Sequence, residues 1–401
     1  MATISVQELA RLVPCSVDRV ERLRQAGLLA PENGQHDSAD VHVVRLMSAF
    51  EDAGISLEDV ARGVAEGELS FPMGLFMPPP MERSVTYAAL AARLQCRPGF
   101  LRRLSTELGF APAADDHLRA EDAEILSRII MTLDLADEDE LSRYARLYGG
   151  TIQRLVAAGL QFFDVVVRQK VAAFDLPNEE KDRIVYQHGA GFGGLASEIV
   201  PWLQRRHRER GVLEYLVGVT ETFMEERGIT PEQSRQLPAI AFLDLTGYTA
   251  LAEERGDAAA AELATGLASI VQETSQPHGG RPVKWLGDGV MFHFPNPGNA
   301  ILGGLDLVEQ TEEALSVAAR IGINAGTLIA QEGDFFGRTV NVAARIVEHA
   351  QPREVLVSEA AKERSTADHV SFELVGEVLL KGMTKPVRLH RARRAAKSLG
   401  R

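Results

Sequence analysis

The spacing of apolar positions changes near residue 239 and divides the chain into two regions. Before that point, apolar residues recur at helical spacing, most continuously in two long stretches at 148–175 and 196–227. After it, short strand-like runs alternate with helical stretches, beginning with a strand at 239–249 and a hairpin at 281–294. The pattern predicts an all-α N-terminal region followed by an α+β domain.

The N-terminal region contains an internal repeat. Residues 4–31 align with residues 85–112 at a shift of 81, and the similarity continues beyond them at a shift of 81 or 82. The aligned pairs are Ser5/Thr86, Leu9/Leu90, Ala10/Ala91, Cys15/Cys96, Arg22/Arg103 and Leu23/Leu104. The two cysteines are therefore expected to fill matching apolar positions in two similar cores.

Each repeat has the start and stop signals of a helix-turn-helix arrangement. Ser5 and Thr86 precede a helical pattern, as N-cap residues do, and the second helix of each unit is expected to close at Gly27 or Gly109. The first unit resembles the winged-helix DNA-binding region of MerR-type regulators, including its segment AFEDAGISLEDVARGV. The sequence thus predicts duplicated MerR-like helix-turn-helix units.

Charge argues against DNA binding by either unit. Residues 1–70 hold six Arg and no Lys against twelve Asp or Glu, and residues 81–146 hold nine Arg against twelve acids. A helix in a DNA groove needs several cationic contacts with phosphates even for non-specific affinity. We therefore expect both units to pack against protein.

Four segments follow from these patterns, with a stiff Pro-rich break after the first. We expect helical units at 1–75 and 81–147, a helical dimerisation and switch region at 148–232, and a C-terminal domain at 235–395.

The composition is that of an ordinary soluble protein, with 45% hydrophobic and 25% charged residues. The net charge of −13 argues against non-specific affinity for nucleic acid or anionic lipid. The start lacks the pattern of a signal peptide, and apolar runs such as 155–163 are too short to cross a bilayer. Two cysteines provide no disulfide framework. We expect a cytoplasmic protein that does not contact a membrane.

Two aspartates in the C-terminal domain are candidates for metal binding. Asp244 ends an apolar strand just before Thr246 and Gly247, and Asp288 lies at the expected hairpin tip. Either one alone is more often a turn or cap residue. Together on adjacent strands they could hold a pair of Mg²⁺ ions, which take oxygen ligands from one or two carboxylates and from substrate phosphates.

Five motifs, in order, resemble those of class III nucleotidyl cyclases over about residues 235–395. They are FLDLTGYT, KWLGDG, GINAGT, DFFGRTVNVAAR and LLKGMTKPV. The resemblance implies an α/β sandwich sheet, cyclisation of a nucleoside triphosphate with release of pyrophosphate, and two Mg²⁺ or Mn²⁺ ions per active site.

The resemblance also assigns roles to individual residues. They are the metal ligands Asp244, Leu245 (through its backbone) and Asp288, the purine-reading Lys284 and Asp334, the transition-state pair Asn341 and Arg345, and the polyphosphate-binding Lys381.

The polarity of the purine-reading pair implies ATP as the substrate. Adenine offers an acceptor at N1 and a donor amine, which suit a lysine donor and an aspartate acceptor. Guanine reverses that edge, and guanylyl members of the family carry Glu and Cys-type residues instead. Glu332 lies in the same loop as Asp334, so a slip of register would change which acid reads the base.

In this family the active site lies between two catalytic domains, which implies a homodimer for a chain with one such domain. Much of residues 40–230 resembles the mycobacterial pH-responsive adenylyl cyclases, whose N-terminal domain inhibits catalysis at neutral pH. A proton, a small molecule or a lipid is the candidate signal, and His188, His207 and His349 are the candidate titrating groups.

Two other functions stay open at this point. One is a DNA-binding MerR-like regulator whose cyclase domain senses a nucleotide. The other is a guanylyl cyclase. The acidic N-terminal region and the full set of metal and transition-state positions oppose the DNA-binding regulator, and a comparison of ATP with GTP as substrate would decide on the guanylyl cyclase.

Overall fold

The computed structural model describes residues 3–13, 15–31, 33–69, 71, 83–110, 116–132, 134–229 and 237–395. Its contacts separate two compact units, Met1–Glu214 and Tyr215–Arg401, and the division falls inside one long helix. The Pro-rich break expected at 72–80 lies outside the described residues, as does most of the turn expected at 228–238.

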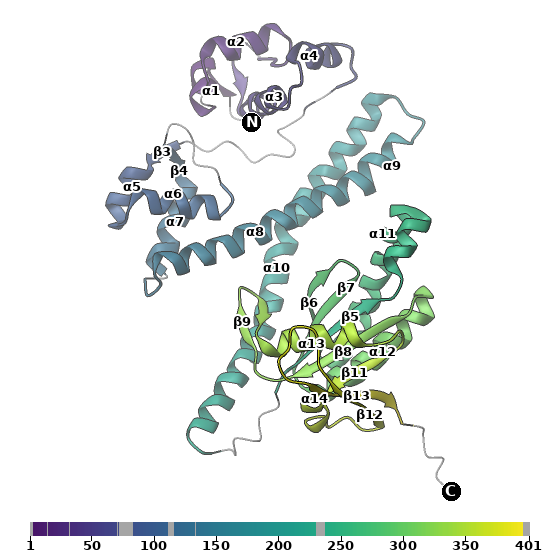
Figure 1. Ribbon diagram of the computed structural model, residues 1–401. Helices are drawn as coiled ribbons and strands as arrows, with labels where there is room; N and C mark the ends of the chain where they lie inside the picture. Colours follow the sequence, from purple (N-terminus) through teal and green to yellow (C-terminus); the bar gives the residue numbers. More distant parts are fainter. Residues whose placement is uncertain are drawn as a thin grey trace. The chain divides into compact units, whose positions relative to one another are not determined.

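The first helical unit begins the chain (Figure 1). Its elements are β1 (Thr3–Ile4), α1 (Val6–Leu12), α2 (Val17–Gln25), β2 (His36–Asp37), α3 (Asp40–Asp52) and α4 (Leu57–Ala65). Ser5 caps α1 through a capping box, in which its hydroxyl accepts from the Glu8 backbone and the Glu8 carboxylate accepts from the Ser5 backbone. Helix α2 ends before Gly27, which has a positive φ of 77°.

The second helical unit repeats this plan. Its elements are β3 (Arg83–Thr86), α5 (Tyr87–Leu94), α6 (Pro98–Glu107), β4 (His117–Arg119) and α7 (Ala120–Thr132). Thr86 caps α5 by accepting from the Ala89 backbone, and α6 ends before Gly109, whose φ is 95°. The predicted caps and helix-ending glycines are confirmed in both units.

The two units also bury matching positions. Their cores contain the aligned pairs Leu9/Leu90, Val20/Leu101 and Leu23/Leu104, none of which is more than 2% exposed. Free Cys15 and Cys96 pack at the edge of these two cores. The repeat read from the sequence therefore corresponds to a repeated core.

The prediction of an all-α region is wrong in one respect, because each unit contains a short antiparallel strand pair. β1 pairs with β2, with Thr3 opposite Asp37, and β3 pairs with β4, with Thr86 opposite His117. Strands of two to four residues are too short to show alternation along the sequence. The resemblance to MerR-type regulators stays a prediction.

Long helices follow the two units: α8 (Glu138–Phe163), a π-helical turn η2 (Asp164–Arg168), α9 (Gln169–Ala172) and α10 (Asn178–Glu226). Phe192 of α10 packs against Phe162 and Phe163, with ring centroids about 6 Å apart. By length and composition alone, residues 138–172 could also span a membrane, a test that helices of soluble proteins pass too.

The C-terminal domain is built on a seven-stranded mixed sheet in the order β12-β13-β11-β8-β5-β7-β6. Its strands are β5 (Ala239–Leu245), β6 (Arg281–Leu286), β7 (Gly289–Phe294), β8 (Ala319–Ala325), β11 (Val355–Ser358), β12 (Val370–Val378) and β13 (Val387–Arg394). The helices are α11 (Tyr248–Ser275), the 3₁₀ turn η4 (Gln276–His278), α12 (Pro297–Leu315), α13 (Arg338–His349) and α14 (Glu359–Glu363).

Alternation along the central strand assigns the two faces of this sheet. Ala241 and Leu243 of β5 pack in the cluster that includes α11 and α12, whereas Ile240 and Phe242 pack against α13. The predicted sheet between helices is confirmed (Figure 1). The loop expected to hold Glu332 and Asp334 is instead part of a hairpin, β9 (Ile329–Gln331) and β10 (Asp334–Phe336).

Candidate active site

Asp244 and Asp288 lie close together at one end of the central strands. Asp244 is on β5 opposite Gly289 of β7, and Asp288 directly precedes Gly289 at the tip of the β6–β7 hairpin. Burial raises the pKa of the Asp288 carboxyl, and the charge of Asp244 raises it further. The structure therefore brings together the two carboxylates expected to bind metal.

Arg320 on β8 is a third charged residue at this place. It is the cross-strand partner of Asp244, and its Nε and Nη2 donate to the Asp244 Oδ2 at 2.8 and 2.5 Å. Its Nη1 donates to the carbonyls of Glu348 and Ala350, at 3.4 and 3.3 Å, at the end of α13. Arg320 thus joins the end of the sheet that carries both aspartates to helix α13.

The residues present fit a hard divalent cation. Two carboxylates and the backbone carbonyl of Leu245, whose side chain is buried, are oxygen ligands of the kind that Mg²⁺ and Mn²⁺ prefer. A Cβ at Gly289 would lie 3.0 Å from the Leu243 carbonyl oxygen and 3.8 Å from the Asp244 Oδ1, so glycine keeps the approach open. The described residues contain no cluster of three or more His, Cys, Asp or Glu side chains suited to a metal.

Lys284 and Asp334 contact each other directly. The Lys284 Nζ on β6 donates to the Asp334 Oδ2 at 2.6 Å, and the Phe335 backbone donates to the Asp334 Oδ1 at 2.7 Å. Lys284 also lies over the ring of Phe336, 5.5 Å from its centroid. Glu332 occupies the β9–β10 turn with a positive φ of 53° and is exposed.

Asn341 and Arg345 lie on the solvent face of α13. Their spacing of four residues places them on one side of the helix, while Val340, Ala343 and Val347 pack on the sheet. Arg345 pairs with Glu348 on the same helix. Within the described part of the chain, no hydrogen bond or ion pair joins Asn341 or Arg345 to either aspartate.

Lys381 is in the turn between β12 and β13 and is exposed. Its neighbour Leu380 is 3% exposed and packs with Val342 and Ile346 of α13. This contact fixes the turn beneath the same helix that carries Asn341.

The sequence-predicted residues therefore form three groups within one chain: the aspartates, the Lys284–Asp334 pair, and the α13 group with its neighbouring turn. Sequence reasoning missed Arg320. The signal was a lone charged residue inside the apolar strand ARIGINA, next to the strand that carries Asp244.

Comparison with known proteins agrees with this geometry. The family model of the adenylate and guanylate cyclase catalytic domain matches residues 231–391. A pH-sensitive adenylate cyclase of Mycobacterium tuberculosis is 29% identical over 308 residues, covering 70% of this chain and 77% of the relative. An uncharacterized protein of the same species is 26% identical over 352 residues, covering 85% and 88%.

Among solved structures, the adenylyl cyclase CyaB from P. aeruginosa is 22% identical with a TM-score of 0.37, and covers 41% of this chain and 96% of its own. The catalytic-domain match and the relatives that extend over most of the chain lead to one assignment: the protein is a class III cyclase of the adenylate cyclase type, with its catalytic domain at residues 231–391.

Proposed function

We propose that this chain converts ATP to 3′,5′-cyclic AMP and pyrophosphate in composite active sites of a homodimer. The observation that carries the proposal is the 2.6 Å contact between Lys284 and Asp334. It holds one donor and one acceptor side by side, complementary to the N1 and amine of adenine. Its position also favours Asp334 over Glu332 as the acid that reads the base.

Asp244, Asp288 and the Leu245 carbonyl would hold the divalent ions, two per active site. Bound Mg²⁺ or Mn²⁺ neutralises phosphate charge and acidifies the ribose 3′-hydroxyl. A dication held by these carboxylates would also offset the burial and the charge of Asp244 that raise the pKa of Asp288.

The α13 group, Asn341 and Arg345 with Lys381 of the neighbouring turn, acts on the reacting ribose and phosphates. The 3′-oxygen forms a bond to the α-phosphorus as the bond to pyrophosphate breaks, and negative charge grows on the α-phosphoryl oxygens. The Arg345 guanidinium meets that charge, and such a donor typically contributes about 3 kcal/mol to the transition state. Asn341 orients the ribose, and Lys381 binds the polyphosphate.

The contacts that these groups make within one chain support a homodimer. Within one chain Arg345 pairs with Glu348, and Asp244 pairs with Arg320. A second copy, related by a two-fold axis, can supply the α13 group to the aspartates of the first. Each site would then contain residues from both chains.

We also propose that the N-terminal region inhibits the catalytic domain in a cytoplasmic protein that binds neither membrane nor DNA. A relative is named as pH-sensitive, which supports a proton as the signal; a small molecule or lipid is the alternative. His188 and His207 on α10 and His349 at the end of α13 are exposed, so protons would reach all three directly.

Cyclic-nucleotide production by the purified chain tests the activity. ATP and GTP are supplied separately, with Mg²⁺ or Mn²⁺, from pH 5.5 to 8. We expect cyclic AMP from ATP and much less product from GTP. A preference for GTP would replace the substrate assignment, and no product from the full chain or from residues 231–401 would remove the catalytic proposal.

Complementation tests the composite site. Asp288→Ala and Asn341→Ala chains should each lose about 100-fold or more of the activity when alone. Mixed in equal amounts, they should regain activity through the one intact site of each mixed dimer. Mixtures of Asp288→Ala with Asp244→Ala provide the control. Each chain of such a mixed dimer lacks one of the two aspartates that it supplies to its site, so no intact site can form.

A further inference from the structure

Helix α10 carries a line of exposed apolar side chains. Each of them is at least 40% exposed, and they are Leu195, Ile199, Trp202, Leu213, Leu216 and Phe223. Nearly every residue from 193 to 226 is exposed in the described part of the chain. A surface helix with this much exposed apolar area is typical of an interface.

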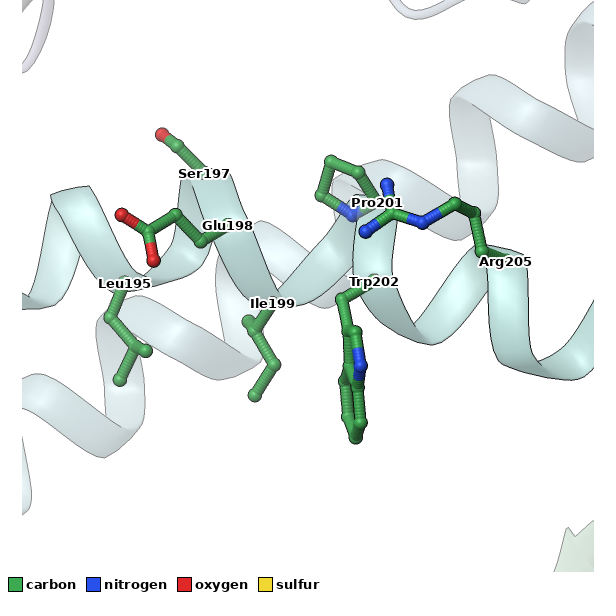
Figure 2. A pocket seen from close by; sticks show the side chains of 7 residues that line it. All are labelled: Leu195, Ser197, Glu198, Ile199, Pro201, Trp202 and Arg205. Carbon is green, nitrogen blue, oxygen red and sulfur yellow. The ribbon is translucent and has the colours of Figure 1, made fainter.

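The spacing of these residues is that of a coiled coil. From Leu195 onward, steps of four and three residues alternate, as at the a and d positions of a heptad. We call the whole line the α10 seam: Leu195, Ile199, Trp202, Arg206, Glu209, Leu213, Leu216, Thr220 and Phe223. Figure 2 shows the first three of these side chains projecting from the same side of the helix.

Pro201 lies inside helix α10 but outside the seam. It occupies an outer position of the heptad, and Figure 2 shows it on the side of the helix away from Trp202. A proline inside a helix removes one backbone hydrogen bond and bends the axis. Because Pro201 lies off the seam, the steps of four and three residues continue past it.

The centre of the seam is charged. Arg206 and Glu209 fill one a and one d position and form an ion pair within the helix at 3.1 Å, with both side chains about two-thirds exposed. An exposed pair of this kind contributes little to stability. In an interface, polar residues at a or d positions select the register and orientation of the partner.

We propose that two copies of α10 pack antiparallel along this seam, about a two-fold axis between residues 207 and 208. The inference rests on the homodimer proposed above. In this register Arg206 of each copy faces Glu209 of the other. The same axis brings Trp202 opposite Leu213 and Ile199 opposite Leu216, so apolar side chains meet apolar ones.

A parallel pair fits the same seam less well. Identical residues would then face each other, so Arg206 would meet Arg206 and Glu209 would meet Glu209 in successive layers. Like charges facing each other in an interface cost binding free energy. Charge complementarity therefore selects the antiparallel arrangement.

Disulfide cross-linking of the full-length chain tests the orientation, in a background with Cys15→Ser and Cys96→Ser. The Trp202→Cys/Leu213→Cys double variant should form a covalent dimer under mild oxidation, and neither single variant should. Within one helix the two positions are about 16 Å apart, too far for an internal disulfide. Gln204→Cys/Tyr215→Cys, with the same spacing on the outer side, is the matched control.

A charge exchange tests the register independently. Glu209→Arg should raise the dimer dissociation constant about tenfold or more, because two arginines then face each other on each side of the axis. Adding Arg206→Glu to the same chain should restore the original constant. Helical content by circular dichroism checks that each variant folds.

The remaining outcomes separate this inference from the proposed function. Cross-links in the single variants would mean a parallel seam and would overturn it. A sedimenting dimer with cyclase activity and no cross-link would mean that the two copies meet through another surface, and the inference would fail while the homodimer stands. A monomer that makes no cyclic nucleotide would remove both.

Discussion

At the residue scale, the ion pair between Arg320 and Asp244 is the most informative contact of the site. Both side chains are partly buried, and two hydrogen bonds to one carboxylate oxygen fix the geometry. The guanidinium balances charge where two carboxylates lie side by side. Arg320 therefore stabilises the end of the sheet that carries the two aspartates.

Replacing Arg320 with Gln should lower the free energy of unfolding of the metal-free protein by about 1 kcal/mol, because Asp244 is left beside Asp288 without its cation. Urea unfolding of the chain in EDTA measures this. Arg345→Gln is the control: its pair with Glu348 is more exposed, and its loss should change stability by less than about 0.5 kcal/mol. Equal effects of the two variants would contradict the stabilising role of Arg320.

The two cysteines give a second prediction at this scale. Burial raises the pKa of both thiols, so little thiolate is present at neutral pH. We expect iodoacetamide to modify the native chain slowly and the urea-unfolded chain quickly, with the modified residues located by mass spectrometry. Rapid modification of native Cys15 would show that the first core opens easily.

At the element scale, a glycine in the sheet allows helix α13 to pack closely against it. A Cβ at Gly322 of β8 would lie 2.2 Å from the Val347 backbone nitrogen and 2.8 Å from the Ile346 carbonyl carbon, so any side chain there pushes the helix away. The glycine sets how closely Asn341 and Arg345 approach the rest of the domain.

Gly322→Ala should therefore destabilise the catalytic domain by about 2 kcal/mol and lower kcat, since α13 must shift. Thermal unfolding and cyclase assays measure the two effects. Gly211→Ala on α10 is the matched control, because nothing lies within 4 Å of its Cβ position, and helix propensity predicts a gain of about 0.5–1 kcal/mol. A stable, fully active Gly322→Ala chain would refute the close-packing argument.

Local signals predicted most elements well, and non-local contacts account for what was missed. The capping box at Ser5 and the glycine after α2 are readable within a few residues. The β9–β10 hairpin depends on a turn in which Glu332 takes a positive φ, which its sequence does not favour. The contact of Arg320 with Asp244 could not be predicted because it depends on the pairing of β8 with β5, which lie far apart in the sequence.

At the scale of the whole molecule, the expected inhibition by the N-terminal region can be measured directly. Removing residues 1–230 should raise the specific activity at neutral pH, because the catalytic domain is released from the region that holds it inactive. Sedimentation of both chains at the assay concentration separates this effect from loss of the dimer. Equal activity of the two dimeric chains would mean that the N-terminal region does not inhibit.

One helix belongs to both units of the molecule, since α10 runs from Asn178 to Glu226 and the division falls between Glu214 and Tyr215. Each residue of a helix advances it by about 1.5 Å and turns it by about 100°. The number of residues in the helix therefore sets the direction in which later side chains point. Inserting one residue rotates all following side chains by about 100°, whereas inserting seven returns them almost to the original direction. Evolution can lengthen such a helix in heptad steps and keep the α10 seam on one side, but a single-residue insertion would break the seam.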